Sequence, residues 1–272
     1  MKNILWQSWT FRLGQLLGAG LVATLTWNAA AQATECTNKD ALGTSRILDV
    51  DAATTPRVGL KSFPQTLPLK DHEVVLTFDD GPWPATTPKV LKALANECVL
   101  ATFFLIGKPA SEHPDLVRQI EAAGHSIGTH SWTHPDLAQL KPSDAVDQIN
   151  HGISAVETVL HGVPTTKPST PFFRFPGFSS TPATLALLQS RGIVVFGADL
   201  WASDWNPMTP EEELKLLTGR LEAAGRGIIL LHDPKAHTAA MLPAFLRYLK
   251  EHNYHVVHVV PTPPRTGIAR AP

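Results

Sequence analysis

The side chains best suited to chemistry follow short apolar runs of the chain. Five such runs are followed by groups that can bind a metal ion, move a proton or hold a charge. These groups are Asp79 and Asp80, His130 and His134, Arg174, Asp204, and His232. Two adjacent carboxylates after an apolar strand repel each other unless something neutralises them. The acidic pair therefore predicts a bound cation, and the alternative is a solvated turn in which one carboxylate caps the next helix.

Two histidines four residues apart can share one face of a turn. With one carboxylate, His130 and His134 give two imidazoles and one Asp, which leaves a coordination position open, as in catalytic zinc sites. Such a pair alone is a weak signal, because a chain with 12 histidines in 272 residues can contain one pair at this spacing by chance. The pair predicts a metal site through its combination with the other groups.

These groups together can carry out a hydrolysis. A metal ion lowers the pKa of a bound water and polarises a carbonyl. A second carboxylate can then take the proton of the water, and a histidine across the site can protonate the leaving group. The set suits an amide or an ester. The sequence has no Gly-x-Ser-x-Gly pattern, so it does not predict a serine nucleophile.

Short apolar runs alternate with helical patterns from residue 73 onward. The predicted strands are 73–78, 101–107, 125–130, 172–175, 193–200, 227–231 and 255–260. The predicted helices are 87–96, 110–123, 143–160, 182–191, 210–224 and 238–253. This alternation favours an α/β fold with a mostly parallel sheet, either closed as an incomplete barrel or open and doubly wound. Both arrangements collect functional groups at the carboxyl ends of the strands.

Residues 1–33 have the pattern of a secretory signal peptide, with a basic start, an apolar run and small residues at Ala31 and Ala33. The apolar run is shorter than the roughly 20 residues of a membrane-spanning helix, and an uncleaved anchor is the alternative. Cleavage would leave an extended leader at 34–72, a domain at 73–260 and a Pro-rich tail at 261–272. We therefore expect a secreted or periplasmic protein without stable membrane insertion.

The composition excludes several classes of protein. With 23 Lys and Arg against 24 Asp and Glu, and no run of four basic residues, the chain is not expected to bind nucleic acid. Two cysteines are too few for a disulfide scaffold or a four-thiolate zinc site. In an oxidising compartment Cys36 and Cys98 can pair. The alternative is two unpaired thiols.

The chain resembles the polysaccharide deacetylases with a NodB-homology domain, carbohydrate esterase family 4, in five ordered motifs: TFDDGP, HSWTH, RFPG, SDW and LLHD. The resemblance spans residues 73–260. It implies a distorted (β/α)7 barrel and metal-dependent removal of acetyl groups, N-acetyl above all, from a polysaccharide or oligosaccharide such as chitooligosaccharide or peptidoglycan. It also implies a Zn²⁺ cofactor, or another divalent ion such as Co²⁺ or Ni²⁺.

The resemblance assigns the reacting groups by position. Asp79 is the expected general base, which activates a water on the metal, and His232 is the expected general acid. The expected metal ligands are Asp80, His130 and His134.

The resemblance also assigns supporting groups. Arg174 is expected to hold Asp79, and Asp204 to orient His232. Trp205 and Leu230 are expected to wall the pocket for the acetyl methyl group. The backbone N–H of Gly177 is the expected oxyanion donor.

Two residues depart from the family pattern, and both lie where a sugar would bind. Gly177 stands where the family usually has an aromatic residue. Trp201 stands at the first Asp of the usual Asp-x-x-Asp-Trp, and Asp199, two residues earlier, is the candidate substitute. Other readings are an acetylxylan-type O-deacetylase, a non-catalytic carbohydrate-binding protein on the same fold, and a metal-free amidase of cyclic ureides.

Overall fold

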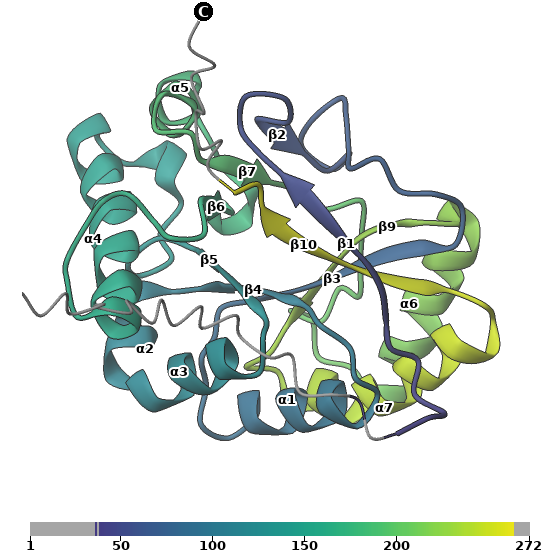
Figure 1. Cartoon of the computed structure of the whole chain (residues 1–272). Helices are drawn as coiled ribbons and strands as arrows, with labels where there is room; N and C mark the ends of the chain where they lie inside the picture. The colour runs from purple at the N-terminus through teal and green to yellow at the C-terminus, as the bar shows by residue number, and fades with distance from the viewer. Residues whose placement is uncertain (1–35, 37, 264–272) are drawn as a thin grey trace, which may run out of the picture. The chain divides into compact units, whose positions relative to one another are not determined.

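The computed structural model describes Cys36 and residues 38–263 (Figure 1), so the predicted signal peptide and most of the predicted tail lie outside the described residues. The strands of the described part are β1 (Thr44–Val50), β2 (Arg57–Val58), β3 (Glu73–Asp79), β4 (Thr102–Leu105), β5 (Ser126–Thr129), β6 (Phe172–Phe173), β7 (Val194–Phe196), β8 (Leu200–Trp201), β9 (Gly227–His232) and β10 (His255–Pro261). The α-helices of this part are α1 (Thr87–Asn96), α2 (Gly107–Glu112), α3 (Pro114–Ala122), α4 (Pro142–His161), α5 (Pro182–Ser190), α6 (Pro210–Ala224) and α7 (Ala236–Glu251).

Every strand pairing is parallel, which confirms the predicted class of sheet. Strand β3 lies at the centre and pairs with β4, with β9 and, at its first two residues, with β10. From β4 the row continues through β5 and β6 to β7, and from β9 it continues to β8. The row of seven strands from β8 through β9, β3, β4, β5 and β6 to β7 forms a barrel. It is open at one place, because β7 and β8 do not pair.

The strands are buried on both faces, as parallel strands between helices usually are. All seven residues of β3 are buried. Leu76 and Phe78 pack in a cluster with residues of α1 and α7, whereas Val75 packs with Phe104 and Phe196 in a second cluster. The core therefore holds β3 from both sides, and its carboxyl end is a rigid place for functional groups.

Two predicted elements are each divided in the structure. The predicted helix 110–123 is the pair α2 and α3, which are separated at His113 because Pro114 begins the second helix. The predicted strand 193–200 is the pair β7 and β8. Between these strands Gly197 accepts a hydrogen bond from Arg174 through its carbonyl oxygen, 2.7 Å away.

The predicted leader contributes two strands to the sheet. Strand β1 runs parallel to β10, and β2 pairs with β7 (Figure 1). Cys36 and Cys98 form a disulfide with a Cα–Cα distance of 5.7 Å, which settles the alternative of two unpaired thiols. The leader is thus joined to the domain by a covalent bond as well as by hydrogen bonds. In the described residues no helix has the length and apolarity that crossing a membrane would need.

Candidate active site

The sheet brings the chemically active groups of the sequence to one edge. Asp79 is the last residue of β3 and lies in register with His232, the last residue of β9. His130 and Arg174 directly follow β5 and β6. Since all these strands are parallel, their carboxyl ends meet at the same edge, and the residues face one pocket or lie directly behind it.

Asp79 is held by a buried arginine. Nη1 of Arg174 lies 2.7 Å from Oδ1 of Asp79 and 2.8 Å from the hydroxyl of Thr77. The other guanidinium nitrogens donate to the carbonyls of Phe196 and Gly197, so all three nitrogens have partners. Burial raises the pKa of the Asp79 carboxyl, and the positive charge of Arg174 opposes this rise. The arrangement suits a carboxylate that gains and loses a proton.

Asp80 lies beside the two histidines and has a different environment from Asp79. Its Oδ1 is 3.5 Å from Nε2 of His130 and 3.3 Å from Nε2 of His134. This oxygen is buried and has no hydrogen-bond partner in the described structure. A buried oxygen without a partner is costly, and a cation between these three groups would satisfy it.

His130 is in the state that metal binding requires. Burial lowers the pKa of His130 to about 3, so its ring is neutral at neutral pH. Its Nδ1 lies 2.7 Å from the carbonyl oxygen of Arg174, which makes Nδ1 the protonated nitrogen and leaves the Nε2 lone pair toward Asp80. One ligand atom each from Asp80, His130 and His134 lie within 4.8 Å of one another. The three residues therefore fit a divalent cation.

His232 faces this cluster from the other side of the pocket. Its Nδ1 is 2.8 Å from Oδ1 of the fully buried Asp204, and its backbone N–H donates to Oδ2 of the same carboxylate. Burial disfavours the charged ring. The hydrogen bond and charge of Asp204, with the charges of Asp79 and Asp80, outweigh burial and raise the pKa of His232 to about 9. A protonated His232 with Nε2 toward the pocket is suited to give a proton.

The pocket between these groups has a volume of about 430 Å³. The other three sequence-predicted residues also line it: Gly177, Trp205 and Leu230. Trp205 is half exposed, and its ring stands edge-to-face to His232. The backbone N–H of Gly177 has no acceptor among the hydrogen bonds of the described residues. It is therefore free to donate to a ligand.

Three lining residues were not predicted from the sequence: Lys61, Phe175 and Phe178. Trp201, which was expected where a sugar would bind, lines the pocket as well. Phe178 supplies an aromatic ring one position after Gly177, in a turn where both residues have positive φ. The positive φ values of this turn cannot be found from periodicity. The alternation of apolar runs also carries no signal for Lys61, which comes from the leader. Asp199 is absent from the lining, so it does not replace the carboxylate missing at Trp201.

The TFDDGP motif (77–82) and the LLHD motif (230–233) are in close contact at Gly81. A side-chain carbon at Gly81 would overlap the carboxylate of the buried Asp233. Asp233 accepts a short hydrogen bond from Thr87, which itself accepts from the backbone of Trp83. The loop after β3 is thereby held against the loop after β9. Asp80 has a φ of 74°, a conformation that Asp adopts more readily than most residues.

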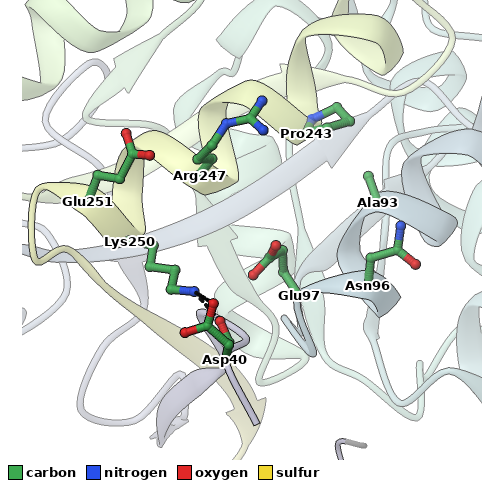
Figure 2. A pocket seen from close by; sticks show the side chains of 8 residues that line it. All are labelled: Asp40, Ala93, Asn96, Glu97, Pro243, Arg247, Lys250 and Glu251. Carbon is green, nitrogen blue, oxygen red and sulfur yellow. Dashed lines mark hydrogen bonds and ion pairs between the residues drawn. The ribbon is translucent and has the colours of Figure 1, made fainter. Parts of the chain in front are cut away.

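A larger hollow of about 570 Å³ lies between α1, α7 and the leader, and Figure 2 shows its lining. Two of its three carboxylates already have partners. Asp40 pairs with Lys250, and Glu97 accepts from the backbone N–H of Leu42. No histidine lines it. It lacks the metal-binding and proton-transfer groups of the first pocket, which remains the candidate active site.

Comparisons with known proteins agree with this geometry. A model of the polysaccharide deacetylase family matches residues 67–196. The chain is 32% identical over 190 residues to the peptidoglycan-N-acetylglucosamine deacetylase of Listeria monocytogenes, covering 70% of this chain and 38% of that protein. It is 34% identical over 163 residues to the chitooligosaccharide deacetylase of Bradyrhizobium sp., covering 60% of this chain and 71% of that protein.

A solved structure, the peptidoglycan deacetylase of Bdellovibrio bacteriovorus, matches with a TM-score of 0.72 at 30% identity, covering 82% of this chain and 60% of that one. The part of the Listeria protein that the chain matches is less than half of that protein's length. The chain belongs to the polysaccharide deacetylase family, carbohydrate esterase family 4, and its (β/α)7 barrel is the NodB-homology fold.

Proposed function

We propose that the protein is a metal-dependent deacetylase that removes N-acetyl groups from an amino-sugar polysaccharide or oligosaccharide. The observation that carries the proposal is the unpartnered Oδ1 of Asp80 between two histidines, beside the Asp79–Arg174 pair and opposite His232. The relatives of this chain include a peptidoglycan-N-acetylglucosamine deacetylase and a chitooligosaccharide deacetylase, which favours an N-acetyl substrate.

Asp80, His130 and His134 would hold the ion, and two imidazoles with one carboxylate favour zinc, with cobalt or nickel able to replace it. The ion would supply Lewis-acid polarisation of the acetyl carbonyl and a lower pKa for water. Asp79 accepts the proton of the attacking water, and Arg174 keeps the carboxylate in place. The free N–H of Gly177 donates to the oxygen that becomes negative.

His232 then delivers its proton to the leaving amine. Asp204 stabilises the protonated ring and holds it so that Nε2 faces the pocket. Trp205 and Leu230 shape an apolar wall for the acetyl methyl group. Acetate and a free amine on the sugar are the products. All these roles belong to the proposal.

Acetate release tests the reaction. The protein is stripped of metal, reloaded with zinc, cobalt or nickel, and incubated with chitopentaose, peptidoglycan glycan strands or acetylated xylan. We expect acetate from the first two only, and only after reloading. Elemental analysis of the wild type and His130→Ala checks the site. Equal metal content in the two proteins, or equal acetate release before and after reloading, would contradict the proposal.

We also propose that the chain is exported and that its first 33 residues are removed. The signal pattern and a disulfide, which forms in oxidising compartments, support this. The mature protein would lie in the periplasm or outside the cell. Intact-mass measurement on exported protein should show a chain that begins at Thr34. A full-length mass in the membrane fraction would favour the uncleaved anchor.

A further inference from the structure

Lys61 brings an unpaired positive charge to the candidate active site. It lies in the loop between β2 and β3, before the first residue matched by the family model. Among the lining residues it is the one lysine or arginine, and its side chain is exposed. Its ammonium lies 4.6 Å from the centre of the Trp201 ring, and no carboxylate of the described residues pairs with it.

The backbone that carries Lys61 is held in place by Asp199. The Asp199 carboxylate accepts from the backbone N–H of Leu60 at 2.8 Å and from the hydroxyl of Thr66 at 2.7 Å. It also accepts from the N–H of Ile228 in β9. The N–H of Lys61 itself donates to the carbonyl of Ala198. The loop is therefore fixed to both β9 and the chain after β7, so the backbone of Lys61 has a defined place beside the pocket.

The backbone of Trp201 is held by Arg220. Arg220 donates from Nη1 to the carbonyl oxygen of Trp201 at 2.6 Å and to the hydroxyl of Ser203 at 2.8 Å. Its guanidinium lies 5.4 Å from the centre of the Trp201 ring. In the strand register Trp201 is paired with Leu230, the proposed wall of the acetyl pocket. Lys61 and Trp201 therefore line the pocket beside that wall.

The charge of this wall differs from that expected from the family pattern. Where the pattern has a carboxylate, this chain has Trp201, and the neighbouring carboxylate of Asp199 is used by the loop. An ammonium without a carboxylate partner, next to the half-buried ring of Trp201 in the pocket lining, suits a ligand that is both a sugar and an anion. Of the two carboxylates that line the pocket, Asp79 is paired with Arg174, and Asp80 would be neutralised by the ion.

We infer that Lys61 and Trp201 form a subsite for a carboxylate-bearing sugar that adjoins the acetylated one. The protein would then prefer acidic glycans to neutral ones. The inference rests on the proposed function for the reaction at the neighbouring sugar, and it deepens that function by naming the class of substrate. The carboxylate can belong to the sugar itself or to a peptide attached to it.

The test compares three probes: peptidoglycan glycan strands freed of peptides, the same strands with their carboxylates amidated, and chitopentaose. For Lys61→Gln we expect kcat/KM on the acidic strands to fall about 3- to 20-fold, mainly through KM, as for the loss of a partly exposed ion pair. On the two neutral probes it should stay within about twofold. Lys61→Arg should restore the preference, and Lys167→Gln, an exposed lysine outside the pocket, should have no effect.

Strands that still carry peptides separate the two sources of the carboxylate. If Lys61→Gln lowers kcat/KM on both kinds of strand, a carboxylate from either source can bind at the subsite. If it does so on peptide-bearing strands alone, the carboxylate belongs to the peptide. An equal effect of Lys61→Gln on acidic and neutral probes, or no effect on any, would overturn the inference.

Binding without turnover separates this inference from the proposed function. Asp79→Asn protein is titrated with the three probes, alone and with Lys61→Gln added. Tighter binding of acidic strands that depends on Lys61 supports the subsite even if the wild type releases no acetate, an outcome that would reject the proposed function alone. Binding that ignores the carboxylates would reject the subsite alone.

Discussion

Asp79 and Asp80 are neighbours in sequence with different surroundings. Asp79 is buried against Arg174, whereas Asp80 has an unpartnered oxygen between two histidines. The positive φ of Asp80 turns the chain between them, so the two carboxylates have separate partners. A general base and a metal ligand can therefore stand side by side, each tuned by its own contacts.

The two Asn substitutions should fail in different ways. Asp79→Asn cannot accept a proton, so kcat should fall by roughly 10²- to 10⁴-fold with metal content unchanged. Asp80→Asn removes a charged ligand, so metal affinity should fall and added zinc should restore part of the rate. Elemental analysis and acetate release measure both. If Asp79→Asn loses its metal while Asp80→Asn keeps it, the roles are reversed.

Residue types at the strand ends predicted most of the groups that the structure brings to one pocket, but not all of its lining. The acidic pair, the histidine pair and His232 stand out in the sequence because carboxylates and imidazoles at strand ends have few other uses. Phe178 was missed because its ring enters the pocket through two successive positive φ values. Lys61 was missed because its place depends on three hydrogen bonds to Asp199, which no local pattern shows.

Helices α6 and α7 form a buried polar contact behind His232. Glu213 of α6 is fully buried, and its Oε1 lies 2.9 Å from the hydroxyl of Thr238 of α7. The same hydroxyl lies 3.0 Å from Oδ2 of Asp204. One hydroxyl proton cannot serve two carboxylates. Burial, together with the charge of Asp204, raises the pKa of Glu213 to about 7. Below that pH Glu213 carries a proton, and its carboxyl group can donate to Thr238 while Thr238 donates to Asp204.

This contact predicts a fall in stability as pH rises from about 4.5 to about 7. In that range the folded protein keeps a proton on Glu213 that the unfolded chain releases, so raising the pH favours unfolding. Glu213→Gln keeps a donor and should flatten this part of the stability curve. Urea unfolding at several pH values measures it. Glu211→Gln, at an exposed position of the same helix, is the control. An equal slope in both variants would contradict the prediction.

Helix ends were predicted well where capping residues mark them. Helix α6 has the predicted bounds because Thr209 and Glu212 form a capping box and Pro210 occupies the first turn. Strand ends were predicted less well. The apolar run 193–200 gave no sign of its division into β7 and β8, because the break depends on Arg174 binding the carbonyls between them. That arginine is distant in sequence.

In the part of the chain that the structure describes, the leader is the segment that completes the domain. Strand β1 covers β10, and β2 extends the sheet beyond β7. Arg46 of β1 makes two hydrogen bonds to Glu73 at the start of β3, which lower the pKa of Glu73 to about 2. The sequence predicts an extended leader but no strands in it, because pairing partners more than 130 residues away leave no local trace.

The disulfide should stabilise this arrangement without taking part in the reaction. It joins residues 62 positions apart, and closing a loop of that size typically stabilises a protein by about 2–4 kcal/mol. Cys98 lies between α1 and β4, at the amino end of the strands and away from the pocket. We expect the double variant Cys36→Ser, Cys98→Ser to unfold at lower urea concentration and to keep the wild-type kcat.

The leader keeps its other contacts in that variant, including Arg46–Glu73 and the β1–β10 pairing, so Lys61 should stay at the pocket. Thiol titration of the denatured wild type should find two thiols only after reduction. The single variant Cys36→Ser should be as unstable as the double variant, since either removes the bond. Unchanged stability in all variants would show that the bond does not form or does not constrain the unfolded chain. A lower preference for acidic strands in the double variant would show instead that the bond positions Lys61.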